Sequence, residues 1–122
     1  MQPQRIILIT DHNRELCDVA ADALNALGAE VLRAYDGCEA MAVLDSRPID
    51  LVLVDLTLPG PVGGDAVVAR ARQKGSVIIT TGVNGTSGPD GIDGACSYLE
   101  KPFRVAALRG LVESALSERL RL

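Results

Sequence analysis

The feature that most constrains this sequence is the stretch Asp50–Gly60, an apolar run that ends in an acid and a turn. Residues 51–54 read Leu-Val-Leu-Val, Asp55 follows them, and Pro59 and Gly60 close the stretch. A Val- and Leu-rich run of this length is typical of a strand that is buried on both faces of a parallel sheet. Ligands of open α/β sheets bind at the carboxyl ends of such strands. Asp55 is therefore placed for chemistry rather than for packing.

Four other runs have the character of strands, and helical patterns separate them. With the central run, the predicted strands are Arg5–Thr10, Glu30–Tyr35, 51–55, Ser76–Thr81 and Ser97–Glu100. Apolar residues spaced three and four apart predict helices through residues 16–27, 40–44, 67–71 and 105–116. Gly28 is expected to close the first helix, and Asp65 is expected to cap the third. The last helix is expected to present Val105 on its apolar face, together with Leu108 and Val112.

Strands that alternate with helices predict a parallel sheet with helices on both faces. Five strands suit a flavodoxin-like three-layer sandwich of strand order 2-1-3-4-5, which makes the first and third strands neighbours. Asp11 and Asp55 follow these two strands, so they should meet at one sheet edge, with Thr81 and Lys101 beside them. The segment Gly82–Gly94 has almost no helix-forming content, so the fourth helix is expected to be short or irregular.

The composition limits the possible functions. With 48% hydrophobic and 23% charged residues, we expect one globular domain over residues 1–122, with no output domain. Aromatic residues make up 2% and the net charge is -4, which argues against nucleic-acid binding. The three cysteines show no C-x-x-C spacing, and no signal peptide or membrane-length run is visible. These features predict a cytoplasmic protein with reduced, buried thiols and no contact with membranes.

The four polar groups suit phosphoryl chemistry. A carboxylate such as Asp55 can attack phosphorus and form an aspartyl phosphate. The transferring group carries charge on its oxygens, so catalysis is mainly positioning and electrostatic stabilisation. Lys101 supplies a positive charge and Thr81 a hydroxyl donor. A hard divalent cation could be held by Asp11, Asp55 and the backbone carbonyl of Thr57.

At this point the sequence resembles the receiver domain of bacterial two-component response regulators. The motifs that carry the resemblance occur in order over nearly the whole chain: Ile7–Asp11, Leu53–Gly60, Thr81 with Gly82, and Tyr98–Phe103. The resemblance implies that Asp55 accepts a phosphoryl group from a sensor histidine kinase or a histidine phosphotransfer protein. It also implies Mg²⁺ as the cofactor and a protein target that binds the face from the fourth strand to the last helix.

The same resemblance assigns roles to the remaining residues. Thr81 would follow the phosphoryl group, Tyr98 would swing inward behind it, and Lys101 would pair with a phosphoryl oxygen. The peptide bond between Lys101 and Pro102 is expected to be cis, as in the family. Such a protein is a signalling phosphoacceptor rather than an enzyme, beyond catalysing its own phosphorylation and dephosphorylation.

One departure from the family pattern concerns the metal. Receivers usually carry two adjacent acids after the first strand, and the second position here is His12. A neutral imidazole is a poor ligand for Mg²⁺, which prefers oxygen. We therefore expect weak Mg²⁺ binding and slow phosphorylation by small-molecule donors.

Three alternatives remain at this point. A degenerate pseudo-receiver would bind its partner without phosphorylation, which His12 and the altered fourth-helix segment favour. A haloacid-dehalogenase-like phosphohydrolase needs a second acid two residues after its nucleophile, where this chain has Thr57. A flavin-binding flavodoxin would need more aromatic residues to sandwich the ring.

Overall fold

The computed structural model describes residues 4–83 and 97–120, and its centre is a parallel sheet. The five strands lie in the order β2-β1-β3-β4-β5. They are β1 (Ile6–Thr10), β2 (Glu30–Ala34), β3 (Leu51–Asp55), β4 (Val77–Val83) and β5 (Ser97–Lys101). Every neighbouring pair is parallel, with Asp55 opposite Thr81 in the β3–β4 register. The predicted fold and strand order are confirmed.

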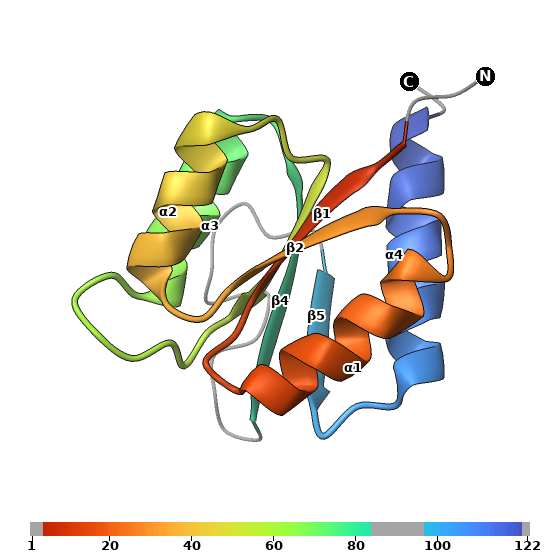
Figure 1. Ribbon diagram of the computed structural model, residues 1–122, viewed down its shortest axis with the longest axis horizontal. Helices are drawn as coiled ribbons and strands as arrows, with labels where there is room; N and C mark the ends of the chain where they lie inside the picture. Colours follow the sequence, from red (N-terminus) through yellow and green to blue (C-terminus); the bar gives the residue numbers. More distant parts are fainter. Residues whose placement is uncertain (1–3, 84–96, 121–122) are drawn as a thin grey trace.

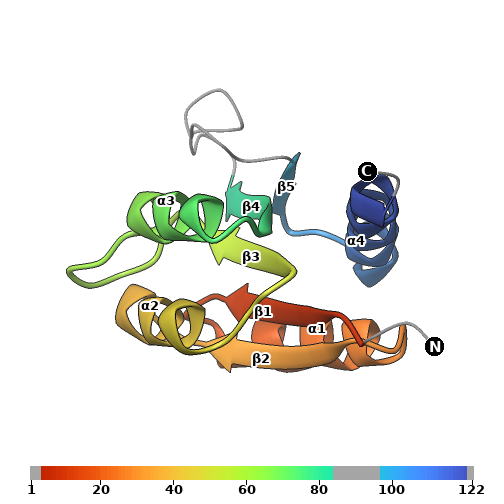
Figure 2. The ribbon, with the colours of Figure 1, turned by 90° about the horizontal axis from the view of Figure 1, so that it is seen from above.

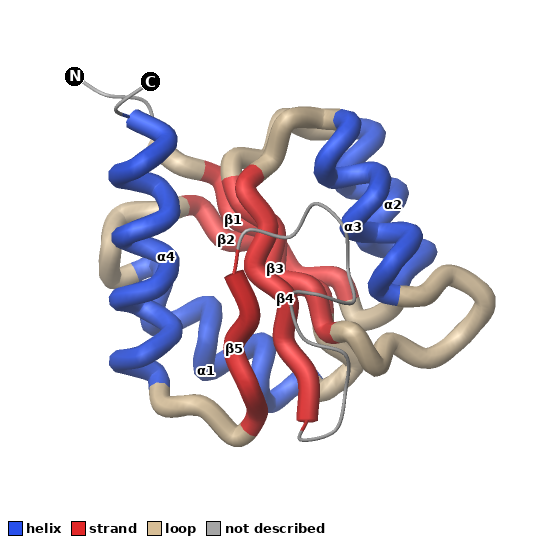
Figure 3. The backbone as a smooth tube through the Cα atoms, turned by 180° about the vertical axis from the view of Figure 1, so that it is seen from behind, coloured by secondary structure: helices blue, strands red, loops and turns tan. Residues whose placement is uncertain are grey.

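Two pairs of helices cover the sheet, one pair on each face (Figures 1 and 2). The helices are α1 (Arg14–Asn25), α2 (Gly37–Ser46), α3 (Gly64–Gln73) and α4 (Val105–Leu120). Figure 3 shows the sheet from behind, with α1 and α4 on one side and α2 and α3 on the other. None of the described helices combines the length and apolar character needed to cross a bilayer. The short or irregular helix that we expected after Gly82 falls almost entirely on residues 84–96, which lie outside the described residues.

Alternating side chains divide the core into two layers. In β1, Ile7 and Ile9 pack toward α1 and α4, whereas Leu8 packs toward α2 and α3. All five residues of β3 are buried, as expected for a central strand with a helical layer on each face. This burial leaves the carboxyl edge of the sheet as the place where β3 presents a functional group.

The start of α3 corrects one expectation. Asp65 does not cap this helix: the N-cap is Gly63, which makes no side-chain cap hydrogen bond, and Asp65 lies in the first turn. The helix begins early because Gly64 packs against β3, where a Cβ atom would lie 2.7 Å from the carbonyl oxygen of Asp55. The negative charge of Asp65 still interacts favourably with the amino end of the helix dipole.

Two other side chains are more exposed than the sequence predicted. Val105 is 36% exposed because it is the first residue of α4, one turn before the buried Leu108. Cys38 is exposed near the start of α2, whereas Cys17 is buried in α1 as expected. Neither of these two cysteines forms a disulfide.

The buried thiol of Cys17 predicts a pH effect on stability. Burial, reinforced by nearby Asp11, raises the pKa of this thiol from 9.0 to about 11. The native state therefore keeps a proton on Cys17 that the unfolded chain loses above pH 9. The contribution of this thiol to the unfolding free energy is complete below pH 9 and is lost as the pH rises through 11. Relative to Cys17→Ala, the wild type should lose ~1–2 kcal/mol of unfolding free energy across this range. Urea titrations at several pH values measure the difference, and parallel curves for the two proteins would contradict the prediction.

Candidate functional site

Three strands bring polar side chains together at the carboxyl edge of the sheet. Asp11 follows β1, Asp55 ends β3 and Lys101 ends β5. The Nζ atom of Lys101 lies 2.6 Å from Oδ2 of Asp11 and 3.4 Å from Oδ2 of Asp55. Residues ninety positions apart in sequence therefore form one cluster, in which two carboxylates face one ammonium.

The two oxygens of Asp55 have different surroundings. Oδ1 accepts hydrogen bonds from the backbone N–H of Thr57 at 2.9 Å and from its hydroxyl at 2.7 Å. Oδ2 faces the ammonium of Lys101 and the ring of His12. Burial raises the pKa of Asp55, but the bonds from Thr57 and the charge of Lys101 outweigh it and hold the pKa below its usual value. Asp55 is thus an ionised carboxylate within the protein, as a nucleophile must be.

Asp11 is almost fully buried and is held by bonds to both oxygens. Its Oδ1 accepts a hydrogen bond from the N–H of Asn13 at 2.9 Å, and its Oδ2 accepts the 2.6 Å bond from Lys101. Asn13 in turn caps α1 by accepting a bond from the N–H of Leu16. The loop after β1 therefore fixes the helix start and the acid together.

His12 enters the same cluster from the solvent side. Its side chain is 53% exposed, and Nδ1 lies 3.2 Å from Oδ2 of Asp55 and 3.8 Å from Oδ1 of Asp11. One ligand atom from each of these three residues lies within 4.8 Å of the others, so the three could hold a metal ion. Two carboxylates suit a hard cation, but the third donor is a nitrogen, which suits Mg²⁺ poorly.

Three hydroxyl groups at this end of the sheet, those of Thr10, Thr81 and Tyr98, are buried without a hydrogen-bond partner in the described part of the chain. Thr81, which faces Asp55 across the ladder, is 1% exposed and its Oγ1 has no partner there. The hydroxyl of Tyr98 on β5 is buried in the same unsatisfied state. Because such groups cost free energy, an unpaired donor beside Asp55 points to a ligand that it would bind.

The unpaired hydroxyl of Thr81 gives a stability prediction. Thr81→Val keeps the shape of the side chain and removes the unsatisfied group, so it should raise the unfolding free energy by ~1 kcal/mol. Thr80→Val is the matched control, because Oγ1 of Thr80 donates to the carbonyl of Ser97 at 3.4 Å. That change should lower the unfolding free energy by ~0.5–1 kcal/mol. Urea unfolding measures both, and equal losses in the two variants would contradict the assignment.

The sequence interpretation missed part of the contribution of Thr57. We expected only its carbonyl at the site, yet its N–H and hydroxyl both bind Asp55. An acid followed two residues later by a hydroxyl residue is a local turn pattern that signals such bonds. The remaining predicted site residue, Pro102, follows Lys101 through a cis peptide bond at the end of β5.

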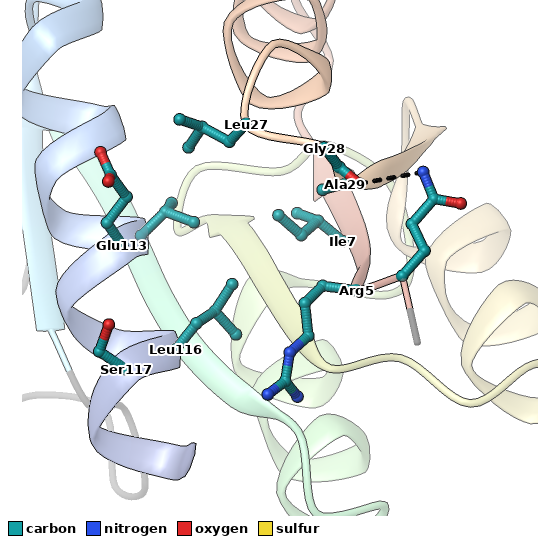
Figure 4. Close-up of a pocket in the computed structure, with 10 residues that line it drawn as sticks. Arg5, Ile7, Leu27, Gly28, Ala29, Glu113, Leu116 and Ser117 are labelled. Atoms are coloured by element: carbon teal, nitrogen blue, oxygen red, sulfur yellow. Dashed lines mark hydrogen bonds between the residues drawn. The ribbon is translucent and has the colours of Figure 1, made fainter. Parts of the chain in front are cut away.

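A separate pocket lies at the opposite end of the sheet (Figure 4). Its volume is about 500 Å³, and Ile7, Leu27 and Leu116 point into it from β1, the α1–β2 turn and α4. Gln4 closes one side by donating to the carbonyl of Gly28 at 3.0 Å. The pocket adjoins the amino end of β1, whereas the acid cluster lies beyond its carboxyl end, so it takes no part in that cluster.

The comparisons with known proteins agree with this geometry. The family described as the response regulator receiver domain matches residues 7–113. The transcriptional regulatory protein CpxR of Klebsiella pneumoniae is 33% identical over 113 residues, which cover 87% of this chain and 48% of that protein. The sensor histidine kinase RcsC of Salmonella typhi is 32% identical over 126 residues, covering 95% of this chain and 12% of that protein. The chain thus spans about half the length of CpxR and a small part of RcsC.

Solved structures show the same architecture. The receiver domain of NtrX from Brucella abortus has a TM-score of 0.83 at 27% identity, covering 91% of this chain and 98% of that one. A CheY-like receiver domain protein from Methanospirillum hungatei has a TM-score of 0.86 at 23% identity, covering 98% of both chains, and shares the fold. With the family match over residues 7–113, these findings show that the chain belongs to the response regulator receiver domains of two-component systems.

Proposed function

We propose that this receiver domain accepts a phosphoryl group on Asp55 from a histidine kinase or a histidine phosphotransfer protein. The observation that carries the proposal is the buried Asp55 carboxylate, which lies 3.4 Å from the ammonium of Lys101. It also lies opposite the hydroxyl of Thr81, which has no hydrogen-bond partner within residues 4–83 and 97–120. An ionised nucleophile, a cation and a free donor are the groups that phosphoryl transfer to a carboxylate requires.

Two hydrogen bonds from Thr57 to Oδ1 fix the orientation of the Asp55 carboxylate. In the transfer, a bond forms between a carboxylate oxygen of Asp55 and phosphorus while the bond from phosphorus to the donor's imidazole nitrogen breaks, and the donor histidine leaves as the neutral or protonated ring. Lys101 would stabilise the charge on one phosphoryl oxygen, and the hydroxyl of Thr81 would donate to another. Tyr98, whose hydroxyl is already buried, would pack behind Thr81.

Asp11, Asp55 and the carbonyl of Thr57 would hold the Mg²⁺ ion that receiver domains use. When bound, the ion would supply positive charge to the phosphoryl oxygens. The site fits it only in part, because His12 presents a nitrogen toward the two acids. We therefore propose weak Mg²⁺ binding and slow reaction with small donors such as acetyl phosphate.

The binding of a downstream protein is part of the same proposal. Phosphorylation at the carboxyl ends of β3, β4 and β5 would change the face formed by β4, β5 and α4, and a downstream protein would bind there. We propose a signalling domain in the cytoplasm that has no enzymatic turnover beyond its own phosphorylation and dephosphorylation. The net charge of -4 supports a protein partner rather than nucleic acid or a membrane.

Transfer from a phosphorylated histidine phosphotransfer protein tests the proposal directly. The expected result is an intact-mass increase of one phosphoryl group in the receiver, with loss of the group from the donor. A protein that binds the donor and takes no phosphoryl group from it or from acetyl phosphate would instead be a pseudo-receiver. Sustained release of phosphate from a monoester would favour the phosphohydrolase alternative.

A further inference from the structure

We propose that the cluster of Asp11, His12 and Asp55 selects a later first-row transition cation, in the range from Fe²⁺ to Zn²⁺, over Mg²⁺. The inference deepens the proposed function and rests on it, since it concerns the metal of the same site. His12 is the residue that changes the selectivity, through the Nδ1 atom of its ring.

The distances already approach those of a coordination sphere. Nδ1 of His12 lies 3.2 Å from Oδ2 of Asp55 and 3.8 Å from Oδ1 of Asp11. Two ligand atoms at right angles around one metal lie about 3.0 Å apart when the metal–ligand bonds are about 2.1 Å. Rotation of the exposed His12 ring can supply the difference, because its side chain is 53% open to solvent.

Each of the two donor oxygens already has one neighbour: the N–H of Asn13 donates to Oδ1 of Asp11 at 2.9 Å, and the ammonium of Lys101 lies 3.4 Å from Oδ2 of Asp55. A carboxylate oxygen has two lone pairs, so each can still bind a metal ion. Lys101 binds the other oxygen of Asp11, Oδ2, at 2.6 Å, and Thr57 binds the other oxygen of Asp55, Oδ1. One oxygen of each acid therefore turns toward the imidazole nitrogen. The ammonium of Lys101 stays beside the cluster, where it limits the negative charge that would attract any divalent cation.

The chemical nature of the donor atoms determines which cation binds more tightly. Mg²⁺ prefers oxygen ligands and gives up water reluctantly, so a nitrogen at this position weakens its binding. Imidazole is a good ligand for the later first-row metals, whose affinity for mixed nitrogen and oxygen sites rises along the series toward Cu²⁺. His12 at the position of the usual second acid thus favours a transition cation and at the same time disfavours Mg²⁺.

The test uses the fact that His12 is the single histidine of the chain. In ¹⁵N-labelled protein, Zn²⁺ should shift the Nδ1 resonance of His12, whereas Mg²⁺ should leave it in place. Calorimetry should show Zn²⁺ binding at least about tenfold tighter than Mg²⁺. Both measurements use a Cys38→Ser, Cys96→Ser background, which removes two thiols that could bind zinc, while burial raises the pKa of the Cys17 thiol to about 11.

Two variants distinguish a role of His12 as a metal ligand from an effect of the local charge. His12→Asp should reverse the preference, tightening Mg²⁺ binding and weakening Zn²⁺ binding. Asn13→Asp adds a negative charge at the next position and still caps α1, since Asp caps helices as well as Asn does. It should leave the ratio of the two affinities unchanged, and an equal reversal in both variants would overturn the proposal.

Phosphoryl transfer measured on the same samples distinguishes this inference from the proposed function. Acceptance on Asp55 combined with a stationary Nδ1 signal, or with Mg²⁺ binding as tightly as Zn²⁺, would overturn the metal preference and leave the function standing. A shifted Nδ1 signal without a phosphoryl adduct from any donor would support the metal preference and remove the proposed function.

Discussion

Replacing Asp55 by Asn is expected to abolish phosphoryl transfer to this protein. The amide keeps the shape of the side chain but lacks the ionised oxygen that attacks phosphorus. Asp11, the other acid of the cluster, has different surroundings, because its Oδ2 accepts a 2.6 Å hydrogen bond from Lys101. Intact mass after incubation with a phosphorylated histidine phosphotransfer protein should therefore show no adduct, against one phosphoryl group in the wild type.

Asp45→Asn is the matched control for this change. Asp45 is an exposed acid of α2 that pairs with Arg70 of α3, on the helical layer away from the acid cluster. The control should accept the phosphoryl group as fast as the wild type, and circular dichroism should show that both variants are folded. An adduct of undiminished yield in Asp55→Asn would mean that another side chain is the acceptor.

The ionised state of Asp55 depends on the groups that surround it in the cluster. Two carboxylates face one ammonium, and the bonds from Thr57 help to keep Asp55 ionised despite its burial. The ionised form of Asp55 is therefore stabilised by the N–H and hydroxyl of Thr57 together with the ammonium of Lys101. Because Thr57 lies only two residues after Asp55, the turn that ends β3 builds this support into the backbone.

The sequence predicted the sheet and the meeting of distant residues for one physical reason. Residues 51–54 are apolar at every position, which favours a strand buried on both faces, and parallel strands end at a common edge. The strand order then places Asp11 beside Asp55, and Lys101, two strands from β3 and three from β1, reaches both acids. The long side chain of Lys101 can span the distance from β5 to the two acids, because all three strands end at the same edge of the sheet.

Details that depend on tertiary distances could not be predicted in the same way. Asp65 has the right residue type for a helix cap, but the contact of Gly64 with β3 moves the start of α3. Likewise, the sequence places His12 near the acids without telling which ring nitrogen faces them. That orientation follows from the path of the loop between β1 and α1, where Asp11 and Asn13 bind each other.

Gly37→Ala is expected to destabilise the protein strongly. A Cβ atom at Gly37 would lie 2.1 Å from the carbonyl oxygen of Val62 and 2.8 Å from its carbonyl carbon, so backbone rather than a flexible side chain must move. The contact joins the start of α2 to the loop between β3 and α3. Overpacking of this kind should lower the unfolding free energy by about 2–3 kcal/mol, measured by urea titration.

Gly110→Ala tests whether the effect comes from this contact rather than from the loss of a glycine. Gly110 lies within α4, and a Cβ atom there would meet no atom within 4 Å among the described residues, apart from the backbone of its own helix. Alanine is the better helix former, so this variant should gain ~0.5–1 kcal/mol. The two identical substitutions should thus shift stability in opposite directions. A stability for Gly37→Ala close to that of the wild type would show that α2 and the loop can separate at little cost, and the packing of α2 beside the site would then be loose.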